Sequence, residues 1–494
     1  MHTRLHAIVR SCALRALVPA IFTLLPACAT RTSKPTLNGK WESSEPVVNL
    51  GRYESVQKRP GQRRDIAVAV AISGGGMRAA NFAAGVLGAL EGVHVRGADG
   101  RDSNLLREVD YFSTASGGGL AAASYLVHLA DYKQRHPEDP TAAGFRFASE
   151  GAEGVKSDGG RNWREALARN YQASLVRAML NPFLRGSMNR GDVLERRLGE
   201  SVLGKVGGRT LTLGDVWVAP GHTPTLPFWV ANATVYENGA IFPFTPDIIE
   251  TYGIKRYCHD EKYQDLASPR DLPLAVGMKA SASFPVAIPT TNLISGIDRQ
   301  NPTLHLMDGG VADNLGVITA ARLLGQDRVA SKKVLIVIDA YNGTAEPFSN
   351  GGMAPGIFTT ALRSTSISLD SAHQRVGNLL ALVARTDGIK TAVVDFHQAR
   401  KKQAVDDLRA AETTGEAAAA MRGMTEKAED TSPQTIDALF TQALGMGTWF
   451  KIKKSNQDAL LRTGANAIYV QDGAAAPAAQ RRLLKDLQQI KNVF

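Results

Sequence analysis

Seven consecutive apolar residues, 66–72, lead directly into Ser73 and the three glycines Gly74–Gly76, and this junction constrains the fold more than any other feature. A strand in which every side chain is apolar is buried on both faces, as parallel strands are in α/β sheets. The residues after the glycines place apolar side chains at helical spacing: Phe82, Val86, Leu87 and Leu90. A strand, a glycine turn and a helix form the start of an α/β unit.

A second stretch repeats this order. Residues 109–113 resemble a strand, 114–118 a tight turn and 120–129 a helix. Further strand candidates follow at four places: 228–232, 303–307, 334–338 and 391–394. With 494 residues and 44% apolar content, the chain can bury a large core. We therefore expect a three-layer α/β/α fold with a mostly parallel central sheet over residues 66–345, and an α-rich C-terminal region, 346–494, packed on that core.

The first residues, 1–27, resemble an export signal. They carry three arginines and no acidic residue, and their apolar stretch, 16–25, is too short to span a bilayer as a helix of ~20 residues. Residues 25–28 read Leu-Pro-Ala-Cys, which is similar to the lipobox of bacterial lipoproteins and predicts acylation at Cys28. The alanine and threonine that follow favour sorting to the outer membrane; an ordinary secretory signal is the alternative. Residues 28–65 are polar and aperiodic, and we expect a flexible tether there.

Charge and cysteine content exclude some classes of protein. Lys and Arg number 57 against 47 Asp and Glu, and removal of the signal's three arginines leaves seven surplus positive charges. This surplus suits anionic lipid headgroups and falls short of a nucleic-acid footprint, while a soluble surface without a charged partner explains it equally well. Three cysteines exclude a scaffold built on disulfides, and Cys258 is the one thiol left if Cys28 is acylated.

The glycine loop at residues 73–78 presents backbone N–H groups without Cβ atoms at a helix N-terminus, where the helix dipole favours negative charge. This suits the oxyanion hole of an acyl-transfer enzyme. It also suits a phosphate group, since Gly74-x-Gly76-x-x-Ala79 matches the dinucleotide-binding pattern. That pattern also needs a strand ending in an acidic residue about twenty residues later, and residues 91–103 are instead polar and interrupted by glycine.

Ser116 lies on the second predicted strand-to-helix turn and is followed by Gly117 and Gly118. Small neighbours are needed where a turn holds a serine in a cramped backbone geometry with its hydroxyl exposed, as in a nucleophile elbow. The usual pattern has glycine two positions before the serine, where this chain has Thr114. A purely structural turn is the alternative.

Asp308 ends a strand-like run and is followed by Gly309 and Gly310. A carboxylate at the carboxyl end of a strand faces the edge where α/β enzymes hold their sites, and it can act as the base for a serine. The alternative is an aspartate that caps a turn.

Together these motifs resemble those of the patatin-like phospholipases, in a bacterial lipoprotein-type member. The shared order is a glycine-rich loop with a basic residue, a serine elbow and an Asp-Gly-Gly motif, here at 73–78, 116–118 and 308–310. Residues 280–285, Ala-Ser-Ala-Ser-Phe-Pro, are similar to a small-residue segment that such proteins carry between elbow and aspartate. The resemblance spans roughly residues 66–345.

The resemblance implies a serine acyl hydrolase of the phospholipase, lysophospholipase or lipase type. Ser116 would attack the ester carbonyl while Asp308 takes its proton. The implied oxyanion hole consists of four residues: Gly74, Gly75, Gly76 and Arg78. Acyl esters of membrane lipids are the implied substrates. No metal or organic cofactor is implied, and nucleic acid is not an expected partner.

Other residues with chemical potential have simpler explanations. His305 lies three residues before Asp308 and, on a strand, points to the opposite face. Residues 258–261, Cys-His-Asp-Glu, lack zinc spacing and are expected to form a solvated loop. An apolar stripe over 171–184 is either a lid or interfacial surface, or ordinary core packing.

Two other classes of function stay open. A catalytically silent lipid-binding or envelope-assembly module has the same fold, and Ser116→Ala or Asp308→Asn separates it from the hydrolase through loss of ester hydrolysis. A nucleotide-dependent enzyme would use the Gly74 loop, and the missing acidic partner disfavours it.

Overall fold

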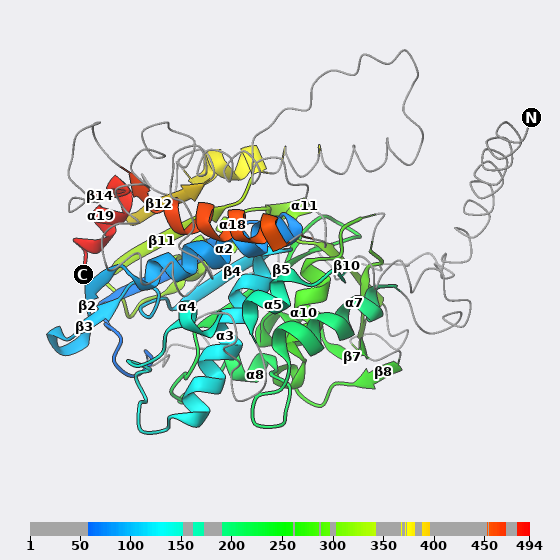
Figure 1. Ribbon diagram of the computed structural model, residues 1–494. Helices are drawn as coiled ribbons and strands as arrows, with labels where there is room; N and C mark the ends of the chain where they lie inside the picture. The colour runs from blue at the N-terminus through cyan, green and yellow to red at the C-terminus, as the bar shows by residue number, and fades with distance from the viewer. Residues whose placement is uncertain are drawn as a thin grey trace, which may run out of the picture. The chain divides into compact units, whose positions relative to one another are not determined.

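The computed structural model describes residues 58–151, 162–171, 190–259, 262–285, 288–296, 303–341, 373–380, 388–395, 454–470 and 482–494, with 367, 371 and 452 beside them. A central ten-stranded sheet is flanked by helices (Figure 1), which confirms the predicted α/β fold class. In the described part of the chain, no helix combines the length and the apolar character needed to cross a membrane.

One half of the sheet is parallel and contains the strand predicted from the apolar run. Its strands, in order across the sheet, are β12 (Ile389–Asp395), β11 (Lys332–Asp339), β1 (Ile66–Ile72), β4 (Tyr111–Ala115) and β5 (Phe228–Val235). All seven residues of β1 are buried. The apolar run therefore forms a central strand, with β11 on one side and β4 on the other, and its burial along the whole length shows that both faces are covered.

The other half of the sheet is antiparallel. It continues from β5 through β10 (Thr303–Asp308), β9 (Thr291–Ser295), β7 (Ile254–His259) and β8 (Lys262–Asp265), while β6 (Ile241–Pro243) also pairs with β5. The strand that carries Asp308 thus runs opposite to the strand that leads to Ser116. Local sequence patterns do not give strand direction, which depends on how distant segments pair.

Helices follow the strands as the sequence pattern predicts. After β1 comes α2 (Gly76–Glu91), and after β4 comes α3 (Gly118–Arg135). A further helix that was not predicted from the sequence, α12 (Val317–Gln326), comes after the Asp308 loop. Among the described residues, the other α-helices are α4 (Phe147–Glu150), α5 (Trp163–Ala168), α7 (Arg190–Leu198), α8 (Leu213–Val216), α9 (Pro246–Thr251), α10 (Leu274–Ser281), α11 (Gly310–Asp313), α18 (Lys454–Asn466) and α19 (Lys485–Lys491). Two small hairpins pair β2 (His94–Arg96) with β3 (Asp102–Asn104), and β13 (Tyr469–Val470) with β14 (Arg482–Leu483).

The C-terminal region contributes to the core in two ways. Helix α18 packs along α2 (Figure 1), so closely that a Cβ on Gly85 would lie 2.2 Å from the Leu461 carbonyl oxygen. A Cβ on Gly464 would likewise lie 2.1 Å from the Phe82 oxygen. In addition, β12 extends the parallel sheet. The described part of this region is therefore not only helical, since it also supplies an edge strand.

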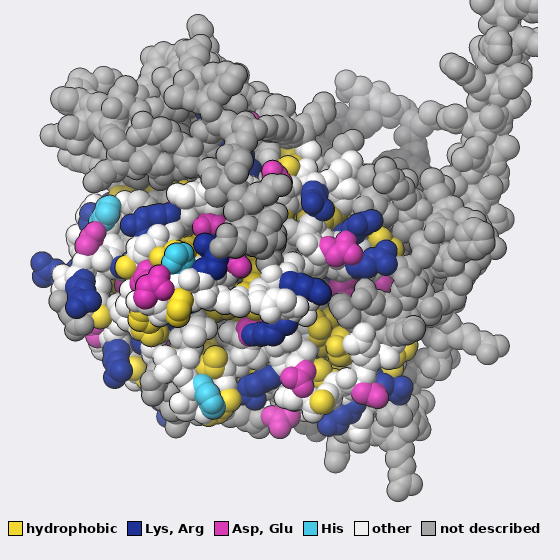
Figure 2. All heavy atoms as spheres, turned by 60° about the horizontal axis from the view of Figure 1, so that its bottom comes forward, with side chains coloured by type: hydrophobic (Ala, Val, Ile, Leu, Met, Phe, Trp, Pro, Cys, Tyr) yellow, Lys and Arg dark blue, Asp and Glu magenta, His cyan; other side chains and the backbone are white. Residues whose placement is uncertain are grey.

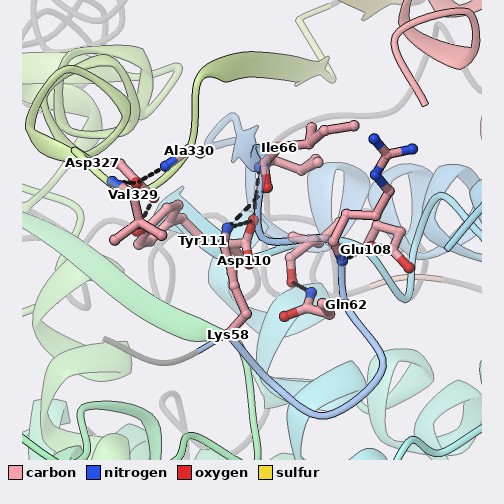
Figure 3. Close-up of polar contacts among 12 residues, drawn as sticks. Lys58, Gln62, Ile66, Glu108, Asp110, Tyr111, Asp327, Val329 and Ala330 are labelled. Atoms are coloured by element: carbon pink, nitrogen blue, oxygen red, sulfur yellow. Dashed lines mark hydrogen bonds and ion pairs between the residues drawn. The ribbon is translucent and has the colours of Figure 1, made fainter. Parts of the chain in front are cut away.

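Residues 58–65 differ from the expected end of a tether, because they pack against the amino ends of the parallel strands (Figure 3). Lys58 lies 2.7 Å from the Asp110 carboxylate and donates to the Ile66 carbonyl at 3.0 Å. Asp110 also accepts the Val68 N–H at 2.9 Å. The polar sequence predicts a tether here, but the charge of Lys58 instead pairs with polar groups where the strands begin.

The surface carries charges of both signs. On the face shown in Figure 2, Lys and Arg side chains are scattered among Asp and Glu side chains over the described part of the chain. The positive surplus of the sequence is thus dispersed on that face, as on an ordinary solvated surface.

Candidate active site

Three loops that follow strands meet at one edge of the sheet. The glycine loop follows β1, the Ser116 turn follows β4, and the Asp308 loop follows β10. A Cβ on Gly74 would lie 3.2 Å from the Ser116 Cβ, and one on Gly117 would lie 2.0 Å from the Gly76 oxygen. The structure therefore brings the first two predicted motifs into direct contact.

Ser116 has the strained backbone expected of a nucleophile elbow. Its φ is 47°, in the left-handed region that residues other than glycine rarely adopt. Strain of this kind persists only where surrounding contacts hold it, and it is common at active sites. The neighbouring glycines are required by space, since a Cβ on Gly118 would lie 2.6 Å from the Ser73 oxygen. The side chain of Ser116 lies between a strand and a helix and is 7% exposed.

Asp308 is buried beside Ser116. Its Oδ1 accepts the Gly310 N–H at 2.8 Å, and Oδ2 has no aligned hydrogen-bond partner among the described residues. Burial raises the pKa of Asp308 to about 6, against the lowering effect of hydrogen bonding from the Ser116 side chain and the Gly310 amide. The hydroxyl is therefore within reach of the carboxylate without the alignment of a full hydrogen bond. Catalytic contacts commonly tighten only when substrate binds.

The register of β5 explains how an antiparallel strand delivers Asp308 to this edge. Strand β4 ends with Ala115 opposite Asn232, but β5 continues to Val235. Strand β10 pairs with this extension and ends with Asp308 opposite Ala233. Ser116 and Asp308 therefore lie at nearly the same level on the two sides of β5.

The glycine loop supports an anion-binding geometry at the start of α2. Gly75 and Gly76 have φ values of 138° and 57°, which favour glycine. The Gly74 N–H donates to the Asn314 carbonyl at 2.8 Å. Arg78 is buried, and its guanidinium lies 3.4 Å from where a Gly75 Cβ would be. The four residues of the predicted oxyanion hole are thus placed beside Ser116, and their roles stay predictions.

Two polar residues support the site without having been assigned a role from the sequence. Buried Asp313 accepts the N–H groups of Leu315, Gly316 and Ile318, which fixes the loop whose Asn314 carbonyl holds Gly74. Burial raises the pKa of Asp313 to about 6. The sequence signal for this residue was the polar pair Asp313-Asn314, which follows the Asp308 motif.

The second supporting residue is Asn232, which lies on β5 between the strands that lead to Ser116 and to Asp308. Its amide donates to the Ser113 hydroxyl at 2.9 Å and to the Thr114 carbonyl at 3.1 Å, while its own oxygen accepts from Thr319 at 2.7 Å. A polar side chain inside an otherwise apolar strand was the available signal.

Thr114 has a structural reason to replace the usual glycine of the elbow. Its side chain is fully buried, and its hydroxyl oxygen accepts the Trp229 indole N–H at 3.0 Å. A buried indole N–H needs such a partner. The departure from the usual pattern therefore serves packing between β4 and β5 and leaves the Ser116 turn intact.

The remaining candidates lie away from the dyad or outside the described residues. His305 faces Glu237, 2.6 Å away, on the side of β10 opposite to Asp308. Cys258 and His259 belong to β7, so the loop predicted at these two positions is wrong, while Asp260 and Glu261 lie outside the described residues. Burial raises the pKa of Cys258 to about 12. Among the described residues, no group of three or more His, Cys, Asp and Glu side chains is arranged to hold a metal ion.

Of the apolar stripe at 171–184, only Tyr171 is described, and it is buried. Cys28 and the predicted signal lie outside the described residues.

Comparison with known proteins assigns the chain to a family. A family model described as patatin-like phospholipase matches residues 70–321, about half of the chain. Among solved structures, human GIVD cytosolic phospholipase A2 is 14% identical with a TM-score of 0.38, covering 82% of this chain and 61% of that one. Its complex with methyl gamma-linolenyl fluorophosphonate and terbium chloride gives 14%, a TM-score of 0.34, and coverages of 85% and 59%.

VipD from Legionella pneumophila is also 14% identical, with a TM-score of 0.25 and coverages of 69% of this chain and 64% of that one. This chain thus spans about three fifths of the solved chains that it matches. No curated protein matches the sequence. The match of the family model over half of its length shows that the chain belongs to the patatin-like phospholipase family.

Proposed function

We propose that this protein is a serine acyl hydrolase that cleaves acyl esters of membrane lipids through a Ser116–Asp308 dyad. The observation that carries the proposal is the juxtaposition of a serine at φ 47° with a buried carboxylate whose Oδ2 has no aligned partner. A structural turn has no need of that strain, and a capping aspartate would satisfy both oxygens. Membership of the phospholipase family supports a lipid ester as substrate.

The proposed reaction transfers one acyl group in two steps. The Ser116 Oγ attacks the ester carbonyl carbon while its proton passes to Oδ2 of Asp308, giving a tetrahedral oxyanion. Collapse of this intermediate expels the alcohol, which takes the proton from Asp308. Water then attacks the acyl-serine, again with Asp308 as base, and releases the fatty acid.

Backbone amides of the glycine loop would stabilise the oxyanion. Because the Gly74 N–H is already donated to Asn314, we assign this role to the amides of Gly75 and Gly76 at the start of α2. The positive end of the helix dipole adds to the same effect. Arg78 lies beside the loop, where its charge would favour an anionic intermediate or a lipid phosphate.

The decisive experiment is labelling with a fluorophosphonate, followed by peptide mapping. This reagent reacts with a serine that is already activated and needs no knowledge of the substrate. We expect an adduct on Ser116 in the wild-type protein and none in Ser116→Ala. A folded wild-type protein that takes up no label would contradict the hydrolase and favour the silent lipid-binding module.

The rate of labelling should depend on pH through Asp308. The carboxylate accepts a proton only when it is ionised, and burial raises its pKa to about 6. We therefore expect a constant second-order rate above pH ~7 and a fall of about tenfold per pH unit below pH ~6. Labelling rates between pH 5 and 8, with circular dichroism at each pH to confirm folding, measure this. A flat profile would exclude Asp308 as the base.

We also propose that Cys28 is acylated and anchors the protein in the outer membrane. The support is the Leu-Pro-Ala-Cys sequence after a basic and apolar leader. Incorporation of radioactive palmitate into the protein, abolished in Cys28→Ser, is the expected result. A wild-type protein that takes up no palmitate would favour the ordinary secretory signal.

A further inference from the structure

The two members of the proposed dyad are not on neighbouring strands. Ser116 follows β4 and Asp308 ends β10, and β5 lies between them. Pairing within the sheet brings them to the same level, but the two residues make no ladder hydrogen bonds with each other. A further contact must therefore hold one against the other with the accuracy that proton transfer requires.

The C-terminal end of α10 makes that contact. The Ser281 hydroxyl oxygen accepts the backbone N–H of Ser116 at 2.9 Å. The carbonyl of the same residue accepts the N–H of Gly309 at 3.1 Å, and the Ser283 carbonyl accepts the N–H of Asp308 at 2.9 Å. One short segment thus holds the backbone of both the nucleophile and the base.

The backbone N–H of Ser116 needs this partner. Its N–H lies past the end of the β4 ladder, where Ala115 is the last paired residue, and Ser116 is buried. A buried N–H without an acceptor is costly, so loss of the acceptor favours relaxation of the turn. Ser281 itself is fully buried, so water cannot easily take over the role of its hydroxyl.

Helix α10 is held in place independently of the dyad. Lys279 is buried two residues before Ser281. Its ammonium group donates to the carbonyl of Thr290, the residue that precedes β9, at 3.1 Å. Burial lowers the pKa of Lys279, and the carboxylates of Glu195 and Asp192 on α7 oppose this effect in part. The helix end therefore offers Ser116 an acceptor whose position is fixed by other contacts.

We propose that Ser281 is a positioning residue of the dyad, whose hydroxyl oxygen holds the strained Ser116 backbone so that Oγ faces Oδ2 of Asp308. This inference rests on the proposed function. It assigns to the Ala-Ser-Ala-Ser-Phe-Pro segment a task in catalysis: its backbone and one hydroxyl join the elbow to the aspartate loop. Ser281 touches neither substrate nor the reacting atoms.

The test compares Ser281→Ala and Ser281→Cys with Ser124→Ala. Cysteine keeps the shape of serine but is a weak acceptor. Ser124 is equally buried, and its hydroxyl donates to the Leu120 carbonyl at 2.8 Å within α3, so it controls for loss of a buried hydroxyl. Each protein is assayed for fluorophosphonate labelling, for hydrolysis of a p-nitrophenyl acyl ester and for thermal unfolding.

For both Ser281 variants we expect kcat and the labelling rate to fall about 100-fold with little change in KM, because a displaced nucleophile loses rate more than binding. Ser124→Ala should stay within about threefold of wild type at a comparable melting temperature. A Ser281 variant that also stays within threefold overturns the inference, as does an equal loss in Ser124→Ala. If the wild-type protein itself takes up no label, the proposed function fails instead, so the two failures are distinct.

Discussion

Replacement of Asp308 by Asn is expected to abolish hydrolysis and, at pH 8, to stabilise the fold. Asparagine keeps an oxygen for the Gly310 N–H but cannot accept the Ser116 proton, so kcat should fall by about 1,000-fold or more. The stability effect follows from the pKa of Asp308, which burial raises from 3.8 to about 6. A raised pKa means that the folded protein holds the proton more tightly than the unfolded chain does.

The Asn variant gains no stability from this effect below pH ~4, and the gain is complete above pH ~6. In wild type, the contribution of Asp308 is fully present below its unfolded pKa and is lost as pH rises through the folded pKa. A shift of this size corresponds to about 3 kcal/mol of folding stability. Wild type loses this stability as pH rises, whereas the Asn variant keeps it because asparagine does not ionise. The free energy of unfolding of the variant, relative to wild type, should therefore rise by about 3 kcal/mol between pH 4 and pH 8.

Ser116→Ala provides the matched control, since it removes activity but keeps the buried carboxylate. Urea titrations of all three proteins at both pH values measure the difference, and comparison across pH cancels any packing change caused by the amide. An Asn variant that hydrolyses esters within tenfold of wild type would contradict the dyad. A relative stability that does not change with pH would contradict the raised pKa.

Gly117→Ala is expected to inactivate the protein by steric conflict alone. Gly117 has φ −56° and ψ −27°, which any residue adopts, so no backbone strain arises. Its Cβ would nevertheless lie 2.0 Å from the Gly76 oxygen and 2.6 Å from the Gly76 carbonyl carbon. The Ser116 turn must then separate from the glycine loop, and both are backbone segments that cannot rotate aside. We expect labelling of Ser116 to fall by about 100-fold or more and the melting temperature to drop.

Gly325→Ala is the control for this substitution. Gly325 lies in α12, and a Cβ there meets nothing within 4 Å. Alanine is the better helix former, so this variant should be as active as wild type and equally or more stable. Normal labelling of Gly117→Ala would show that the elbow and the glycine loop are less tightly packed than the structure indicates.

The features predictable from the sequence are those encoded over short stretches. The apolar run at 66–72 became a buried central strand, and the glycine turns after it and around Ser116 became the turns that meet at one edge of the sheet. Each of these depends on residues adjacent in sequence. The third loop, which carries Asp308, was predicted from the order of the motifs and its resemblance to one family.

What could not be predicted depends on pairing between distant segments. The direction of β10 and its register on β5 are set by the whole antiparallel half of the sheet. The bond from Ser116 to Ser281 joins residues 165 positions apart, and nothing in the segment 280–285 marks which hydroxyl is used. Residues 58–65 resemble a tether in sequence because they are polar. In the fold, Lys58 instead forms an ion pair with Asp110.

The position of Lys58 has a practical consequence for how this protein is held. Lys58 lies at the amino ends of β1 and β4, and Ser116 lies just past the opposite end of β4, about 20 Å away over the six residue steps from Asp110 to Ser116. A resin, sensor chip or fusion partner attached ahead of Lys58 is therefore joined to the described fold at the end of the sheet remote from the Ser116 turn. Up to 29 residues separate Cys28 from Lys58, a contour of at most about 100 Å. The acyl group proposed at Cys28 would thus be connected to the described fold through Lys58, at the end of the sheet remote from Ser116.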